Sequence, residues 1–184
     1  MLNWRNSIVF VGISILMVSC RPDFTDETQA VNSMVGVIDH VQNSSSEIDS
    51  RLVKQYIQDI KQKCAKIQNE MTDTLELEQA QMLVSFCALE GHLTSCIERK
   101  ELVDVQVIET RNQLFNLQTD LMQQVADKDS ANSFIESEFL YVESLSEGIQ
   151  QITTELNGCF STYSELKEEI DRLLIALPDS AADD

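Results

Sequence analysis

The sequence predicts an all-α fold: an elongated, antiparallel, coiled-coil-like bundle of three long helices. Pro22 and Pro178 are the only prolines, and because proline breaks helices, the long stretch between them favours continuous helix. Apolar residues recur in this stretch at the spacing of a helix with one buried face. Two short polar breaks, Thr72-Asp73-Thr74 and Asp127-Lys128-Asp129-Ser130, divide it into three segments. Short connections make neighbouring helices antiparallel.

Residues 1–19 have the pattern of an export signal. Arg5 supplies a positive charge, and the stretch from Ile8 to Val18 is almost wholly apolar. At 1.5 Å per residue this stretch is about 17 Å long, which is short for a bilayer core. It suits the apolar region of a signal peptide. We therefore predict that residues 1–19 are a signal peptide.

The end of this segment, Met17-Val18-Ser19-Cys20, resembles the lipobox of bacterial lipoproteins, in which a small residue precedes an invariant cysteine. Met17 departs from the usual leucine of that family. The resemblance implies that Cys20 becomes the mature N-terminus and carries acyl chains such as palmitate, which together give lasting membrane anchorage. Residues 20–23 would then be a lipidated tether. The alternatives are an ordinary secretory signal with a chance cysteine, or an uncleaved membrane anchor.

The first body segment, residues 24–71, carries an apolar seam that shifts by one position between Leu52 and Val53. Such a slip resembles a heptad discontinuity, which changes the supercoil locally. The run from Asn43 to Ser46 is a weak point for a helix, as are Gly91 and Gly158 further along the chain. We predict one helix over the whole segment, with these positions as the places where a helix kinks or breaks.

The second and third body segments, residues 75–126 and 131–177, are predicted to be single helices. Asp73 and Glu76 have the spacing of a capping box at the start of the second. The seam of the third is regular except at Glu138, where a charged residue stands in an apolar position. Helices of this size each reach roughly 70 Å. Residues 178–184 are predicted to be an acidic, disordered tail.

The cysteines of the body test this hairpin geometry. Cys64, Cys87, Cys96 and Cys159 form an even set, which in an exported chain suggests disulfides. Cys96 and Cys159 lie at equal distances from the second break and on the seams of their helices. Cys64 and Cys87 are placed similarly about the first break, although Cys87 lies beside the seam. We predict both bridges; the alternative is that these cysteines are small buried hydrophobic residues.

No motif for catalysis, cofactor binding or metal binding stands out. His40 and His92 are the only histidines, and neither follows a glutamate at the spacing of a di-iron bundle. The sequence has no glycine-rich phosphate loop and no Cys-x-x-Cys pair. We therefore expect a protein that is not an enzyme and that carries no cofactor or metal.

Three short sequences resemble the Asp-Ser/Thr-apolar O-glycosylation sites of exported Bacteroidetes proteins. They place the acceptors at Thr74, Ser130 and Ser180, each at a predicted turn or in the tail. The alternative is that these residues only cap helices, which is where aspartate, serine and threonine are favoured.

Charge limits the partners of the chain. Thirteen basic residues against 31 acidic residues give a net charge of −18, which argues against nucleic acid and against anionic lipid. We expect a lipoprotein, anchored in the bacterial cell envelope, that acts as a non-catalytic helical spacer or protein-interaction module. Its partners would be proteins, including basic ones, or a second copy. Exposed apolar residues such as Leu140, Leu174 and Ile175 would serve such contacts, unless they complete a wider core. The alternative function is an envelope carrier of small apolar ligands.

Overall fold

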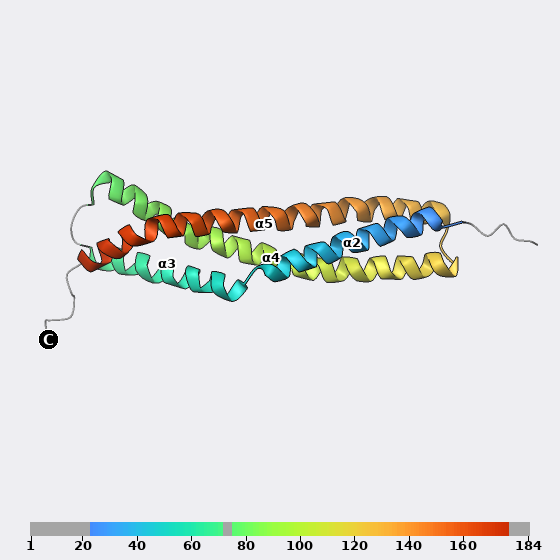
Figure 1. Cartoon of the computed structure of the whole chain (residues 1–184), viewed down its shortest axis with the longest axis horizontal. Coiled ribbons are helices and arrows are strands. Elements are labelled where there is room, and N and C mark those ends of the chain that lie inside the picture. Colours follow the sequence, from blue (N-terminus) through green and yellow to red (C-terminus); the bar gives the residue numbers. More distant parts are fainter. Residues whose placement is uncertain (1–22, 72–74, 177–184) are drawn as a thin grey trace, which may run out of the picture.

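The computed structural model describes residues 23–71 and 75–176, and within these ranges the chain is an all-α bundle. Its helices are α2 (Thr25–Glu47), α3 (Ser50–Glu70), α4 (Leu77–Gln123) and α5 (Lys128–Ala176) (Figure 1). The predicted helical bundle is confirmed, but the prediction of three helices is wrong. The segment expected to form one helix forms two.

The first segment breaks at Ile48 and Asp49. Ile48 takes an extended conformation and ends α2. The carboxylate of Asp49 then accepts hydrogen bonds from the backbone N–H groups of Arg51 and Leu52, each at 3.0 Å. Aspartate is among the strongest N-cap residues, so it begins α3 as a new helix. The break follows the serine-rich run and accompanies the shift of the seam, because Val53 is buried while Leu52 is 43% exposed.

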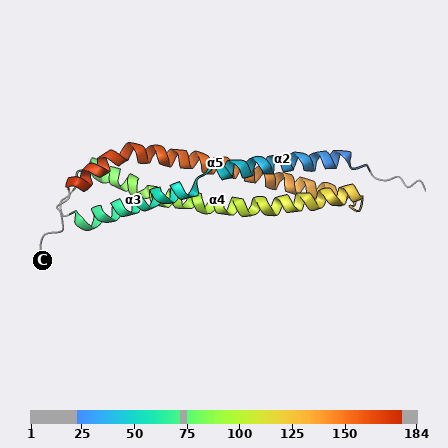
Figure 2. The same cartoon turned by 60° about the horizontal axis from the view of Figure 1, so that its bottom comes forward.

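The four helices build a long, thin molecule with α2 and α3 placed end to end (Figures 1 and 2). α2 runs beside the C-terminal half of α4, where Arg111 pairs with Asp39. α3 runs beside the N-terminal half of α4, where Lys61 lies 3.9 Å from Glu90. α5 spans the whole length; its 49 residues correspond to about 74 Å of helix.

The core is a seam of apolar, mostly aliphatic side chains along the axis of the bundle. The side chains with under 2% exposure include Ile38, Ile60, Phe86, Leu114 and Ile152, one or more from every helix. Their spacing follows the helical period, so each helix buries one face and leaves the other to water. α4 and α5 pass through Gly91 and Gly158 without a break.

Local capping explains where α4 and α5 begin and end. Glu76 is the N-cap of α4 and forms a capping box with Gln79, whose side chain accepts a hydrogen bond from Glu76 N at 3.3 Å. Asp73, the predicted partner of Glu76, lies outside the described residues. Gln124 ends α4 with a left-handed backbone, φ 56°, and Asp127 accepts from the backbone N–H and the hydroxyl of Ser130 at the start of α5.

Candidate functional site

A groove of about 650 Å³ opens beside the break between α2 and α3. We call it the central groove. Ile48, Val53 and Leu156 give it an apolar floor, while Glu47 and Asp49 place two carboxylates at its edge. It is lined by residues of α2, α3, the link between them, and α5: Ser44, Glu47, Ile48, Asp49, Leu52, Val53, Ile149, Gln150, Thr153, Thr154, Leu156, Asn157 and Phe160. This lining fits neutral or cationic groups better than anions.

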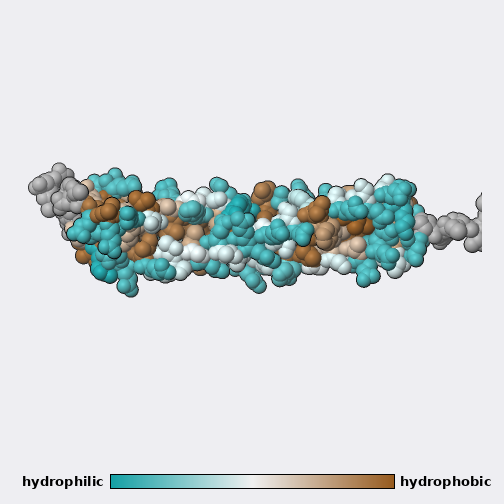
Figure 3. Space-filling view, turned by 90° about the horizontal axis from the view of Figure 1, so that it is seen from above, coloured by the Kyte–Doolittle hydropathy of each residue, from teal (hydrophilic) through white to brown (hydrophobic). Residues whose placement is uncertain are grey.

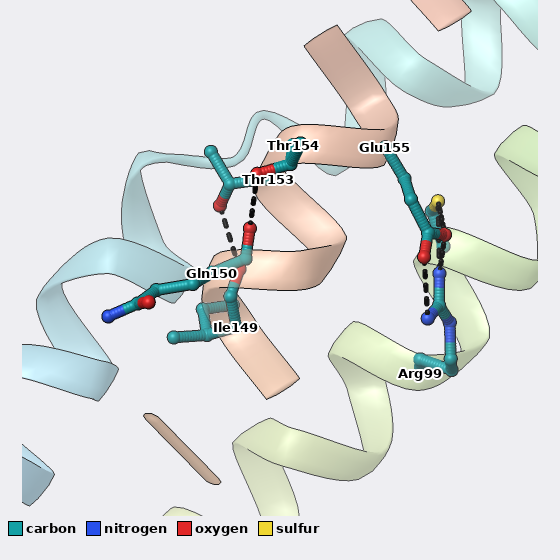
Figure 4. A network of polar contacts seen from close by, with 7 residues as sticks. Arg99, Ile149, Gln150, Thr153, Thr154 and Glu155 are labelled. Carbon is teal, nitrogen blue, oxygen red and sulfur yellow. Dashed lines mark hydrogen bonds and ion pairs between the residues drawn. The ribbon is translucent and has the colours of Figure 1, made fainter. Parts of the chain in front are cut away.

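On the α5 side of the central groove, two threonine hydroxyls already form hydrogen bonds within α5 itself. Thr153 and Thr154 donate their hydroxyl protons to the carbonyl oxygens of Ile149 and Gln150, each at 2.9 Å. Figure 4 shows both threonines and the extended side chain of Gln150 on this side. The amides of Gln150 and Asn157 therefore remain the adaptable polar groups there. The groove can hold a ligand, but it presents no nucleophile with a base.

An ion pair between Arg99 of α4 and Glu155 of α5 joins the two helices (Figure 4). Arg99 forms two hydrogen bonds with the carboxylate of Glu155 and donates a third to Cys96 Sγ at 3.5 Å. The hydrogen bonds from Arg99 lower the pKa of Glu155. Burial raises the pKa of the Cys96 thiol above its ordinary value. Cys96 is therefore a protonated, buried thiol, which is a poor nucleophile.

A smaller groove of about 340 Å³ runs between α2 and α5, and we call it the α2–α5 groove. Its lining is mainly apolar: Ala30, Ser33, Met34, Val37, Ile135, Phe139, Val142, Glu143 and Ser146. Val37 is 38% exposed and Phe139 is 55% exposed. Large apolar side chains this open to water mark a surface that can accept an apolar ligand or partner.

The cysteines of the body pair differently from the full prediction. Cys64 and Cys87 form a disulfide with their Cα atoms 6.0 Å apart, which joins α3 to α4. Cys96 and Cys159 are both buried free thiols, so the predicted Cys96–Cys159 bridge is wrong in this structure.

The position of the turn explains the unformed bridge. α4 ends at Gln123 and α5 begins at Lys128, so the turn is centred about two residues earlier than the sequence indicated. This shift brings Glu155 level with Cys96, whose Sγ lies 3.6 Å from Glu155 Oε2. Cys159 is four residues further along α5, which is about 6 Å of helix.

The remaining predicted site residues are only partly described. The lipidation site Cys20 and the glycosylation sites Thr74 and Ser180 lie outside the described residues. Ser130 is exposed at the start of α5, and its hydroxyl donates to Asp127 at 2.9 Å. Asp127 also accepts from the backbone N–H of Ser130 at 3.0 Å, so the capping that the sequence left open as the alternative to glycosylation is made here by Asp127.

The surface residues singled out for partner contacts separate into two groups. Leu140 is 66% exposed and Ile175 is 83% exposed. Leu174 instead packs against the core, as the wider-core interpretation expects. His40 and His92 are both exposed.

Within 23–71 and 75–176, no group of three or more histidine, cysteine or acidic side chains is arranged to hold a metal ion. None of the helices in these ranges is long and apolar enough to cross a bilayer.

Comparisons with family models, with curated proteins and with solved structures find no match for this chain.

Proposed function

We propose that this protein is a lipid-anchored lipoprotein of the bacterial cell envelope that acts as a non-catalytic helical spacer or protein-interaction module. The observation that carries this proposal is the shape of the molecule, a bundle as long as α5 itself (Figures 1 and 2). A compact domain of this size would have a radius of gyration of about 15 Å. A rod of about 74 Å instead holds its two ends far apart.

The position of the first described residues supports the spacer role. Lys128 at the turn between α4 and α5 donates to the backbone oxygen of Asp23 at 3.0 Å and lies 3.3 Å from Glu27. The first described residues are therefore held at one end of the bundle. An anchor at Cys20, three residues earlier, would attach that end to the membrane and direct the other end outward.

The far end of the rod is braced by cross-links between helices. The Cys64–Cys87 disulfide joins α3 to α4. Tyr163 of α5 donates its hydroxyl proton to Asp59 of α3 at 2.6 Å, and Lys63 bridges Asp59 and Asp171 at 3.1 and 2.7 Å. A braced end suits a protein whose role is to hold a position.

The surface supports contact with other proteins. The face seen in Figure 3 is mainly hydrophilic, with apolar side chains gathered in separate patches. Val37 and Phe139 border one apolar groove, and α4 carries further exposed apolar residues. Patches of this kind on a water-exposed rod are typical of interaction surfaces.

The proposed anchor is tested by the intact mass of the protein purified from its native membrane. We expect the mass of residues 20–184 plus acyl chains, and release of a Cys20→Ala variant from the membrane fraction. A Ser19→Ala variant, which keeps a small residue before the cysteine, should stay in the membrane. A mass that matches all 184 residues without acyl chains would overturn the lipoprotein proposal.

The interaction role is tested by chemical cross-linking in intact cells. In cells we expect one partner protein to be cross-linked reproducibly. When that partner is mixed in solution with the Cys20→Ala variant, the yield of cross-linked product should be unchanged. Absence of any cross-linked protein from cells that display the full chain would leave the rod as a spacer alone.

The α2–α5 groove supports a second candidate, a carrier of small apolar ligands. Its apolar lining and volume of about 340 Å³ lie near the lower limit of ordinary ligand pockets. Nile red, an uncharged apolar dye, is a suitable probe. Stoichiometric binding that a Phe139→Ser change abolishes, and that a Leu140→Ser change leaves intact, would favour the carrier. Absence of saturable binding would overturn it.

A further inference from the structure

The outward face of α4 carries a row of large apolar side chains that no described helix covers. The row consists of Leu102, Val105, Ile108, Phe115 and Met122, and we call it the α4 stripe. Their exposed fractions are 57, 53, 59, 64 and 70%. More of the strongly exposed apolar residues lie on α4 than on any other helix of the described chain. Several large apolar side chains exposed along one helix mark a candidate contact site.

The spacing of the α4 stripe is that of a coiled-coil seam. Ile108, Phe115 and Met122 follow one another at intervals of seven residues, which drift by only about 20° per heptad around a straight helix. Val107 and Leu114, which face the core, directly precede Ile108 and Phe115 in the chain and are therefore turned about 100° away from them around α4. From Val105 to Met122 the stripe is about 25 Å long. α4 therefore has two apolar faces, and the bundle uses one.

Two polar residues lie within the stripe. Asn112 is exposed, and Thr119 donates its hydroxyl proton to the carbonyl oxygen of Phe115 at 2.9 Å. In helix pairs, single polar residues at seam positions fix the register at some cost in stability. The α4 stripe has the composition of a specific, reversible contact rather than of a permanent one.

The stripe lies in an acidic surrounding. Glu98, Glu109 and Asp120 are exposed beside it, and none of the three takes part in an ion pair with another described residue. The nearby cations are already engaged: Arg111 pairs with Asp39, and Lys100 lies 2.7 Å from Asp104. The flanks of the stripe therefore present unpaired negative charge.

We propose that the α4 stripe docks an amphipathic helix of a basic partner protein. The apolar face of that helix covers Ile108, Phe115 and their neighbours. Its lysine and arginine side chains reach Glu98, Glu109 and Asp120, because opposite charges beside a helical seam set the choice of partner. This inference rests on the proposed interaction role and names the surface and the class of partner.

Charge distinguishes this occupant from a second copy of the chain. An antiparallel second copy would place the acidic flanks of one α4 against those of the other. With a net charge of −18 per chain and the neighbouring cations already paired, the two flanks would repel one another. A basic helix meets the same flanks with attraction.

The experiment uses the full chain and a fluorescent three-heptad peptide, with leucine at the a and d positions and lysine at the e and g positions. Fluorescence anisotropy measures its affinity for the wild-type chain, for an Ile108→Ser/Phe115→Ser variant, and for a Val84→Ser/Leu140→Ser control. The control residues are 69 and 66% exposed, matched to the stripe but outside it. A peptide of the same pattern with glutamate at e and g tests the role of charge.

We expect the lysine peptide to bind the wild-type and control chains and to bind the stripe variant at least about tenfold more weakly. Added salt should weaken the binding, and the glutamate peptide should not bind. Equal affinity for the stripe variant and the wild type would overturn the proposal, as would binding of the glutamate peptide. Dimerisation of the wild-type chain in sedimentation, lost in the stripe variant, would also overturn it in favour of a second copy.

These outcomes are separable from failure of the proposed function. If the peptide binds the wild-type chain and the stripe variant equally well while cross-linking still captures a partner, the interaction role stands and the assignment of its surface is wrong. If the chain is captured by no partner in cells, the interaction role itself fails.

Discussion

Glu138 is an acidic side chain buried at an apolar position of the seam, where one of its carboxylate oxygens has no hydrogen-bond partner among the described residues. The side chain is 8% exposed, and the oxygen without a partner is Oε2. Burial raises the pKa of its carboxyl group above the ordinary value. The folded chain therefore favours the protonated form, so the contribution of Glu138 to stability is present at low pH and is lost as the pH rises through the raised pKa.

We predict that replacing Glu138 stabilises the protein near neutral pH. A buried acceptor without a partner costs about 1–3 kcal/mol in the folded state, and Glu138→Leu removes that acceptor. Glu138→Gln keeps the shape and removes the charge. Chemical denaturation should show a gain for both variants at pH 7.5 that shrinks toward pH 4. Glu136, an exposed neighbour, is the control position, and a gain that does not vary with pH would contradict the argument.

The free thiols permit a second prediction at the residue scale. Burial raises the pKa of both the Cys96 and the Cys159 thiols, so iodoacetamide at pH 8 should leave both unmodified in the folded protein. Denaturation without reductant should expose these two, and reduction should expose Cys64 and Cys87 as well. Peptide mapping by mass spectrometry checks the assignment. Protection of Cys96 and Cys159 in denaturant until reduction would show that they form the second bridge after all.

At the scale of the element, the division of the first segment into α2 and α3 shapes the molecule. The serine-rich end of α2 is tied to α4, because the hydroxyl of buried Ser45 donates to Asp104. The chain then turns out of helical geometry at Ile48 and starts again at Asp49. The central groove opens at this discontinuity, so the break both divides the helix and creates the hollow beside it.

We predict that Asp49→Ala destabilises the protein by about 1 kcal/mol, because the backbone N–H groups of Arg51 and Leu52 lose their acceptor. Asp49→Asn keeps an acceptor and should cost less. Asp129→Ala, which removes a carboxylate in the first turn of α5, controls for the loss of charge alone. Urea denaturation followed by circular dichroism measures the effect. An equal cost at Asp49 and Asp129 would mean that the cap contributes nothing specific.

At the scale of the whole molecule, the predicted property is length. Small-angle scattering of the chain in solution should give a maximum dimension of at least about 75 Å. The radius of gyration should be well above the 15 Å or so of a compact domain of this size. The Cys64→Ser/Cys87→Ser variant, which lacks the brace at one end, is the comparison. A compact profile for the wild-type chain would contradict the rod and remove the main support for the spacer role.

Local pattern was sufficient for the all-α class and for the general architecture, but not for the division of the first segment into α2 and α3. The lack of proline between Pro22 and Pro178, the helical spacing of apolar residues and the two polar breaks indicated an elongated helical bundle. These signals depend on residues within a few turns of one another. The same patterns indicated that the Asn43–Ser46 run is a weak point for a helix and that Glu138 places a charged residue at an apolar position of the seam. The functional sites were predicted less completely. Cys20, Thr74 and Ser180 rest on sequence motifs alone, and all three lie outside the described residues.

Only the tertiary structure decided which residues meet across helices. The register between α4 and α5 depends on where the turn falls, and a shift of about two residues places Glu155, not Cys159, beside Cys96. The two grooves and the α4 stripe are likewise set by which faces the neighbouring helices cover. Sequence periodicity marks a residue as apolar and helical, but burial of Leu114 and exposure of Phe115 depend on where the other helices lie. The sequence by itself determined that this protein is a bundle of long helices; packing decided which of its apolar surfaces remain open, because burial is a property of neighbours in space.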